Sequence, residues 1–212
     1  MGRASISVGS TASSQDGIDS FLTVIPSYPM NEQEREKALQ LLERTRLTLR
    51  AAIKGVTSAE AAWKPGPDRW CILQYVEHLA ISDAGLVALV KRIMAEPATP
   101  ETVEQQKERE ERIRSTPVPR GANRAPAALV PPGIYADLGE AMRAFEDARD
   151  RSIEFTRKVQ GDLRSHFHNH GVLGPLDAYQ WLLGNARHVE THSGHIRELR
   201  ELWSATQENA PV

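Results

Sequence analysis

Three histidines in this chain are spaced so that they could bind one metal ion together. His188 and His192 are four residues apart in RHVETHSGHIREL, so on a helix their imidazoles lie on one face, one turn apart. Two ligands from one helix rarely complete a metal site, and His78, in the stretch VEHLAISD, is the candidate for the third. A histidine buried among apolar residues is unfavourable without a partner. A metal ion is one such partner, and a carboxylate or a carbonyl is another.

Imidazole nitrogens suit zinc, nickel, copper or iron. Three protein ligands leave at least one position open for water or substrate, which is typical of a catalytic rather than a structural metal site. Each histidine taken alone is explained as well by a structural role. The prediction of a metal site therefore depends on His78, His188 and His192 occurring together on two long helices.

Four further histidines lie near this group in the sequence. His195 follows His192 by three residues, on nearly the same helix face, and could be a third ligand, a partner of a ligand or a substrate contact. His166, His168 and His170 alternate in SHFHNHG, which indicates either a metal-binding extended segment or a solvated loop above the site. We favour the loop, and keep His168 and His170 as candidates for supporting a ligand or transferring a proton.

The elements that must position these histidines are helices. Apolar residues at helical spacing predict four of them, over residues 31–54, 70–96, 135–160 and 175–205. We expect Asn31 to cap the first helix and Asp68 the second, and Pro175 to open the fourth. Thr45 interrupts the apolar face of the first helix. The stretches between the helices, including GDLRSHFHNHGVLG, are expected to be loops.

Residues 97–133 hold seven of the thirteen prolines. One charged stretch there, EQQKEREERIR, predicts a solvated helical segment. We interpret the region as a long crossover inside one bundle, because neither half of the chain has enough helices to close a core. The prediction is an all-α four-helix bundle over residues 31–205, with a flexible arm at residues 1–30 and a short tail at residues 206–212.

The 212 residues are 40% hydrophobic and 25% charged, with a net charge of -2. These values are ordinary for a soluble globular protein and give no reason to expect a nucleic-acid or membrane partner. No continuous apolar run approaches the roughly 20 residues that span a bilayer. The single cysteine, Cys71, excludes an intramolecular disulfide, suits the cytoplasm and is expected to be a packing residue.

Three stretches resemble motifs of the DinB superfamily, which also contains the YfiT-like proteins. They are WCILQYVEHLA, FHNHGVLGPLDAYQWL and HVETHSGHI, and together they extend the resemblance over roughly residues 32–205. The chain departs from the family at His195, where the family usually has glutamine.

The resemblance implies an up-down-down-up four-helix bundle, often dimeric, with zinc or nickel held by His78, His188 and His192. Members with known activity transfer bacillithiol, mycothiol or glutathione to electrophiles, or isomerise a thiol adduct. It therefore implies a small electrophile and a low-molecular-weight thiol as partners, and we expect a cytoplasmic homodimer.

The leading hypothesis is a metal-dependent enzyme that activates a thiol or water, with His195 or His170 carrying a proton. A metal-dependent hydrolase with the same ligands is the first alternative, although no carboxylate base stands at a fixed spacing from them. The second alternative is a non-catalytic metal-binding or stress-response bundle. A DNA-binding protein is disfavoured by the absence of a basic stripe.

Overall fold

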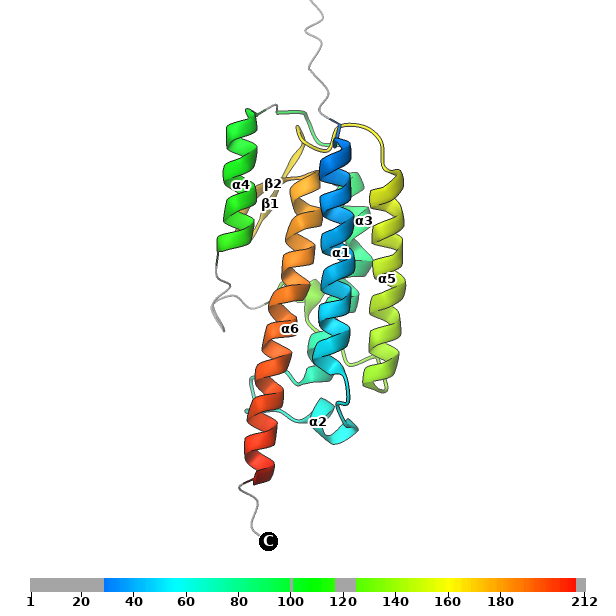
Figure 1. Cartoon of the computed structure of the whole chain (residues 1–212), viewed down its shortest axis with the longest axis vertical. Helices are drawn as coiled ribbons and strands as arrows, with labels where there is room; N and C mark the ends of the chain where they lie inside the picture. The colour runs from blue at the N-terminus through cyan, green and yellow to red at the C-terminus, as the bar shows by residue number, and fades with distance from the viewer. Residues whose placement is uncertain (1–28, 100, 117–124, 209–212) are drawn as a thin grey trace, which may run out of the picture.

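The framework consists of four long helices packed side by side (Figure 1). They are α1 (Glu32–Ile53), α3 (Ile72–Ile93), α5 (Leu138–Lys158) and α6 (Ala178–Glu208). This computed structural model describes residues 29–99, 101–116 and 125–208; the predicted arm lies almost entirely outside them, as does most of the predicted tail. α1 and α6 run in one direction and α3 and α5 in the other. The two members of each parallel pair pack against each other, α6 also packs against α3, and α1 also packs against α5. The predicted up-down-down-up bundle is confirmed.

The first helix begins as its sequence predicts. Asn31 Oδ1 accepts a hydrogen bond from Glu34 N at 2.9 Å, and the Glu34 carboxylate accepts one from Asn31 N at 3.0 Å. This reciprocal pair satisfies backbone N–H groups that the first turn of a helix otherwise leaves without partners.

The predicted cap of the second helix was wrong. α3 begins at Ile72 with Cys71 as its N-cap residue, and Asp68 lies three residues earlier, in a turn. Gln74 supplies the acceptor at this end, because its Oε1 accepts from Cys71 N at 3.2 Å. Cys71 itself is buried, as expected of a packing residue.

One segment expected to be a loop contains a short helix, α2 (Ser58–Ala62). Thr57 caps it by accepting from Glu60 N at 3.2 Å. The Glu60 carboxylate is nearly buried and pairs with Arg200 of α6 at 2.9 Å. A local cap and a distant ion pair together make this turn helical, and only the cap is visible in the sequence.

The Pro-rich crossover carries the predicted charged helix, α4 (Val103–Ser115), and a short 3₁₀ turn, η1 (Ala127–Leu129). Thr102 and Gln105 form a reciprocal cap at the start of α4. α4 packs beside α6 and buries Ile113, so it is solvated on one side only. η1 packs on α3, which brings the end of the crossover to the middle of the bundle.

A two-stranded hairpin precedes the last helix, where the sequence predicted only a loop. β1 (Phe167–His170) pairs antiparallel with β2 (Gly174–Asp177). Pro175 belongs to β2 and does not open the helix, which starts at Ala178. Asp177 Oδ1 accepts from Gln180 N at 2.6 Å and provides the cap in its place.

An ion pair is buried at the centre of the bundle. The guanidinium of Arg149 (α5) lies 2.5 Å from the carboxylate of Asp83 (α3), and both side chains are fully buried. Arg149 also donates to Asn185 of α6 at 3.0 Å and to Thr45 of α1 at 3.4 Å. This network joins all four long helices, and it explains why Thr45 interrupts the apolar face of α1.

Among the described residues, α3 is the one helix long and apolar enough to cross a membrane. It packs against α5 and α6, and Glu77, His78 and Asp83 are buried on it. A core helix of a helical bundle meets the same criteria of length and composition, and Figure 1 shows α3 behind α1, among the other long helices.

Candidate metal centre

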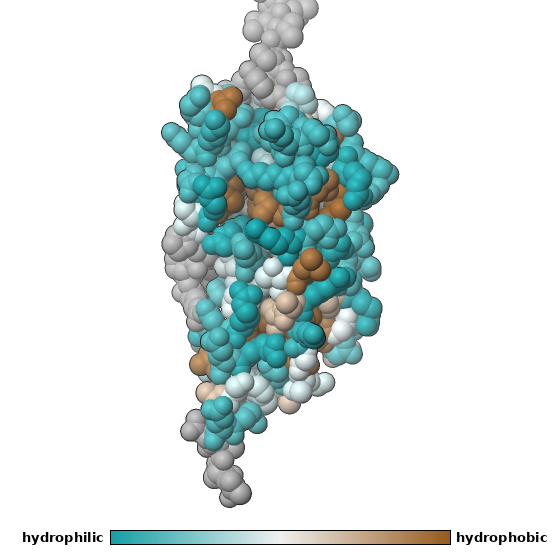
Figure 2. Space-filling model, viewed as in Figure 1, coloured by the Kyte–Doolittle hydropathy of each residue, from teal (hydrophilic) through white to brown (hydrophobic). Residues whose placement is uncertain are grey.

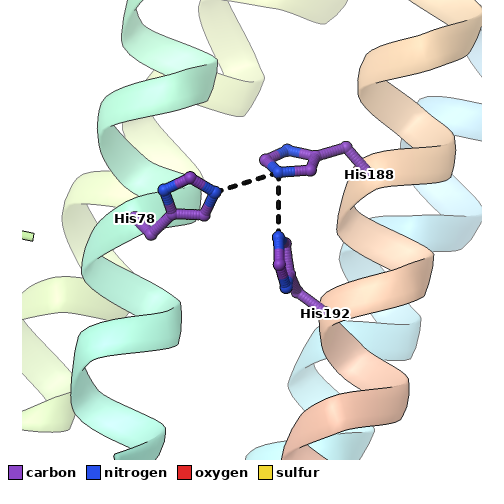
Figure 3. A group of neighbouring side chains, drawn as sticks. All are labelled: His78, His188 and His192. Atoms are coloured by element: carbon purple, nitrogen blue, oxygen red, sulfur yellow. Dashed lines mark hydrogen bonds between the residues drawn. The ribbon is translucent and has the colours of Figure 1, made fainter. Parts of the chain in front are cut away.

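The three predicted ligands meet between α3 and α6 (Figure 3). His188 Nε2 lies 3.0 Å from His78 Nε2 and 2.9 Å from His192 Nε2. The ligand atoms of the group all lie within 4.8 Å of one another. The four-residue spacing on α6 and the packing of α3 beside it thus bring all three imidazoles to one point.

The environment of these rings favours the form that binds metals. Burial, with the neighbouring His78, lowers the pKa of His188 to about 3. Burial also lowers the pKa of His78 and, with His188 beside it, that of His192. All three imidazoles are therefore neutral near pH 7, which is the state in which a histidine binds a metal ion.

Each ligand has a second neighbour at its other ring nitrogen. His78 Nδ1 lies 2.6 Å from the Leu129 carbonyl oxygen, which can only accept. His192 Nδ1 lies 3.2 Å from His195 Nδ1, and His188 Nδ1 lies 3.5 Å from Ser82 Oγ. The contact with Leu129 places the proton of His78 on Nδ1 and turns a lone pair on Nε2 toward the group. Partners of this kind set the tautomer and orientation of metal-binding histidines.

The donor set fits a divalent cation. A Zn–N distance of roughly 2.0–2.1 Å corresponds to about 3.3 Å between nitrogens in tetrahedral geometry. His188 Nε2 lies within a few tenths of an ångström of that separation from each of the other two ligand atoms, at 3.0 and 2.9 Å, and the third pair, His78 with His192, lies within 4.8 Å. His78 is buried, whereas His188 and His192 are half-buried, so part of the group is exposed to solvent.

Two aromatic side chains border the group. The ring of Trp70 lies 4.9 Å from that of His78, and Tyr75 lies 5.2 Å from His192 and 5.7 Å from His195. Trp70 and Tyr75 also meet each other edge to face at 5.3 Å. Trp70 is only half-buried, so it forms part of the wall beside the ligands.

The remaining histidines divide into two groups. His195 touches a predicted ligand directly. His170 Nδ1 accepts from Val172 N and Leu173 N, at 3.1 and 3.2 Å, and holds the turn of the hairpin. His166 Nδ1 lies 2.6 Å from the Glu96 carbonyl oxygen. None of the hairpin histidines joins the metal group in the part of the chain described.

The role of the Leu129 carbonyl could not be predicted from the amino-acid sequence. Any residue can supply a carbonyl oxygen, and only the path of the crossover brings this one to His78. Ser82, by contrast, lies one turn after His78 on α3, and its position on that face was evident from helical spacing.

Comparisons with known proteins concern the fold and the family of the chain. The chain is similar to the structure of YfiT from Bacillus subtilis, described as a probable metal-dependent hydrolase with an unusual four-helix bundle topology. The TM-score is 0.54 at 17% identity, over 85% of this chain and 93% of that chain, so the likeness concerns the fold. No curated protein matches the chain. The model of the DinB superfamily matches residues 41–196, which include all three histidines, and the chain therefore belongs to the DinB superfamily.

Proposed function

We propose that this protein is a metal-dependent enzyme that binds one zinc or nickel ion through Nε2 of His78, His188 and His192. The observation that carries the proposal is the meeting of three neutral imidazoles at one point, where two of the three ligand residues are partly exposed to solvent. A structural zinc site is normally closed by four protein ligands. Three ligands with an accessible side are the arrangement of a site that takes up a reactant.

A divalent cation held there would lower the pKa of a thiol or water that binds it, which supplies a nucleophile near neutral pH. The chain's own residues orient the ligands and restrict water. The Leu129 carbonyl and His195 hold the rings of His78 and His192 through their Nδ1 atoms. Trp70 and Tyr75 cover one side of the ligands with aromatic surface, against which an apolar part of an electrophile would pack.

We favour a thiol as the nucleophile and a small electrophile as its partner. Among the described residues, no aspartate or glutamate belongs to the histidine group. The nearest acid in sequence, Glu77, is already bound to the Ile134 backbone at 2.8 Å. Activation of a thiol does not require a carboxylate base, because a divalent cation stabilises the thiolate directly.

A metal-dependent hydrolase is the second candidate, and the description of YfiT supports it. In that case His195 is the group best placed to accept a proton, because it lies beside the ligand His192. His170 is a weaker candidate than the sequence suggested, since its Nδ1 is occupied by two backbone N–H groups.

The first experiment measures the metal content of the untagged protein by elemental analysis. We expect about one equivalent per chain in the wild type and little in His188→Ala. His166→Ala is the matched control, because that imidazole contacts the Glu96 backbone and lies outside the group. Equal metal content in the wild type and His188→Ala, or none in either after incubation with zinc and nickel, would refute the metal site.

The second experiment compares reactions of the metal-loaded protein. An activated aryl halide is offered with glutathione, cysteine or no thiol, and p-nitrophenyl acetate is offered with water alone. Turnover that requires the thiol and is lost in His78→Ala supports the thiol transferase. Ester turnover without thiol supports the hydrolase. Full metal loading with neither activity would favour a non-catalytic metal-binding bundle.

A further inference from the structure

A cavity of about 420 Å³ lies between α1, α4 and α6. α6 contributes Ala186 and Glu190 to it, each two residues from His188. Two residues correspond to about 200° around a helix with 3.6 residues per turn, so this cavity opens on the side of α6 that faces away from the histidine group. Its volume is within the range of roughly 300–1,000 Å³ that small-molecule sites occupy.

The inner part of the cavity is apolar. Leu41 of α1, Ile113 of α4 and Leu183 of α6 line it, and the last two are buried, with 4% and 6% of their surface exposed. Figure 2 views this face and shows apolar surface between hydrophilic residues where the three helices come together. A hydrocarbon chain or ring of a ligand would be removed from water there.

The rim of the cavity carries more positive than negative charge. Five cations line it against three carboxylates; the cations are Lys37, Arg44, Lys107, Arg114 and Arg187. Arg44 and Arg187 share one carboxylate, that of Glu190, at 3.7 and 3.0 Å.

The other two rim carboxylates, those of Glu110 and Glu111, do not neutralise this excess of positive charge. Glu110 pairs with Lys37 at 2.7 Å but is also bound by the buried Arg164 at 3.2 Å. Glu111 pairs with Arg114. Within the described residues, Lys107 has no ion-pair partner, and the rim therefore has cationic groups available for a further anion.

We propose that this cavity binds a small amphipathic carboxylate. The apolar body lies on Leu41, Ile113 and Leu183, and the carboxylate lies at the rim, where it meets Lys107 and the guanidinium groups of Arg44 and Arg187. Guanidinium groups bind carboxylates through paired N–H donors, and Lys107 adds a point charge. The combination of an apolar floor with a cationic rim selects against both neutral hydrocarbons and small hydrophilic anions.

Isothermal titration of the full-length protein with sodium octanoate tests the proposal, with acetate and octan-1-ol as probes that lack the apolar body or the charge. Arg44→Gln/Lys107→Gln removes two rim charges at exposed positions. Lys54→Gln/Lys64→Gln is the matched control, because it removes the same charge at exposed positions that do not line the cavity. Both are repeated in the His188→Ala background, so that a carboxylate bound at the metal ion is recognised.

We expect octanoate to bind the wild type and the control with equal affinity, and the rim variant about tenfold more weakly. Acetate and octan-1-ol should bind at least about tenfold more weakly than octanoate. His188→Ala should leave octanoate binding unchanged. Equal binding to the rim variant and the control, or loss of binding in His188→Ala, would overturn the proposal, as would tight binding of acetate. Failure of the metal site leaves this test intact, since it does not require bound metal.

Discussion

The Nδ1 atom of His78 lies 2.6 Å from the carbonyl oxygen of Leu129, a residue 51 positions further along the chain. Leu129 ends the 3₁₀ turn in the Pro-rich crossover. On the residue before His78, the Glu77 carboxylate accepts from Ile134 N at 2.8 Å. Two successive residues of α3 thus hold the crossover in place, and the crossover in turn orients one of the three candidate ligands.

The first prediction concerns Glu77. Glu77→Ala removes the acceptor for Ile134 N and releases the crossover, so the contact between Leu129 and His78 is weakened. We expect metal affinity to fall by at least about tenfold, as is typical when the partner of a metal-binding histidine is lost. Glu77→Gln keeps an acceptor oxygen and should remain close to the wild type. Competition against a chelator of known affinity measures both, and tight binding by the alanine variant would contradict the prediction.

The second prediction separates two roles of His195. Its Nδ1 lies 3.2 Å from His192 Nδ1, so it can accept the His192 proton and leave Nε2 free for a metal ion. His195→Gln offers a carbonyl oxygen at this position and should keep about one metal equivalent per chain, whereas His195→Leu should bind metal about tenfold more weakly. If His195 also carries a proton, the glutamine variant shows a changed pH profile of kcat at full metal loading. Identical profiles would leave it an orienting residue.

The third prediction concerns the buried ion pair. Asp83→Ala leaves the Arg149 guanidinium buried without its counter-charge, and we expect the free energy of unfolding to fall by about 3–5 kcal/mol. Chemical denaturation monitored by circular dichroism measures the change. Glu154→Ala, which removes an exposed carboxylate from its pairs with Arg157 and Lys158, should have a much smaller effect.

A double variant that removes both charges tests whether the loss of stability comes from the unpaired charge. Asp83→Leu/Arg149→Met removes both charges and should recover much of the stability that Asp83→Ala loses. A double variant no more stable than Asp83→Ala would show that the cost comes from packing and not from the unpaired charge.

The fourth prediction is a pH dependence of the metal-free protein. Burial and neighbouring imidazoles lower the pKa of His188 to about 3, from an ordinary value of 6.5. Between these two values the unfolded chain binds a proton at this residue that the folded chain does not. The free energy of unfolding should therefore fall as the pH decreases from 6.5, and the contribution of His188 should be constant above that pH.

Urea titrations of chelator-treated protein between about pH 4.5 and 7.5 measure this dependence. His188→Gln cannot take up the proton, so its free energy of unfolding should decline less steeply with acid than that of the wild type. Carboxyl groups contribute equally to both proteins at a given pH, so the difference in slope reports on His188 and on its coupling to the neighbouring imidazole of His192. Parallel curves would contradict the prediction.

Much of the fold could be predicted from local sequence patterns. The periodic apolar residues and the Asn31 cap located α1, and the histidine spacing located the site on α6. The missed features depend on contacts between distant residues or on strand pairing. α2 needs Arg200 to pair with Glu60, and the hairpin needs Phe167 opposite Asp177. Neither of these contacts can be inferred from the helical periodicity of the sequence.

The residues of the candidate site also divide into those that local sequence patterns indicated and those that they did not. Side-chain type and spacing indicated His78, His188 and His192, because a metal site requires particular donors. The place of Trp70 beside the ligands could not be predicted, since an aromatic residue before a helix looks the same in the sequence whether it lies in the core or at a site. The identity of the metal, the thiol cosubstrate, the cytoplasmic location and the homodimer remain predictions.

The use of a main-chain carbonyl at position 129 has a consequence for how this protein can change. A substitution of Leu129 replaces the side chain and leaves the hydrogen-bond acceptor where it is, so most residues there would preserve the support of His78. An insertion or deletion between η1 and α5 would instead shift the oxygen away from the imidazole. This stretch should therefore tolerate changes of residue type, but not insertions or deletions.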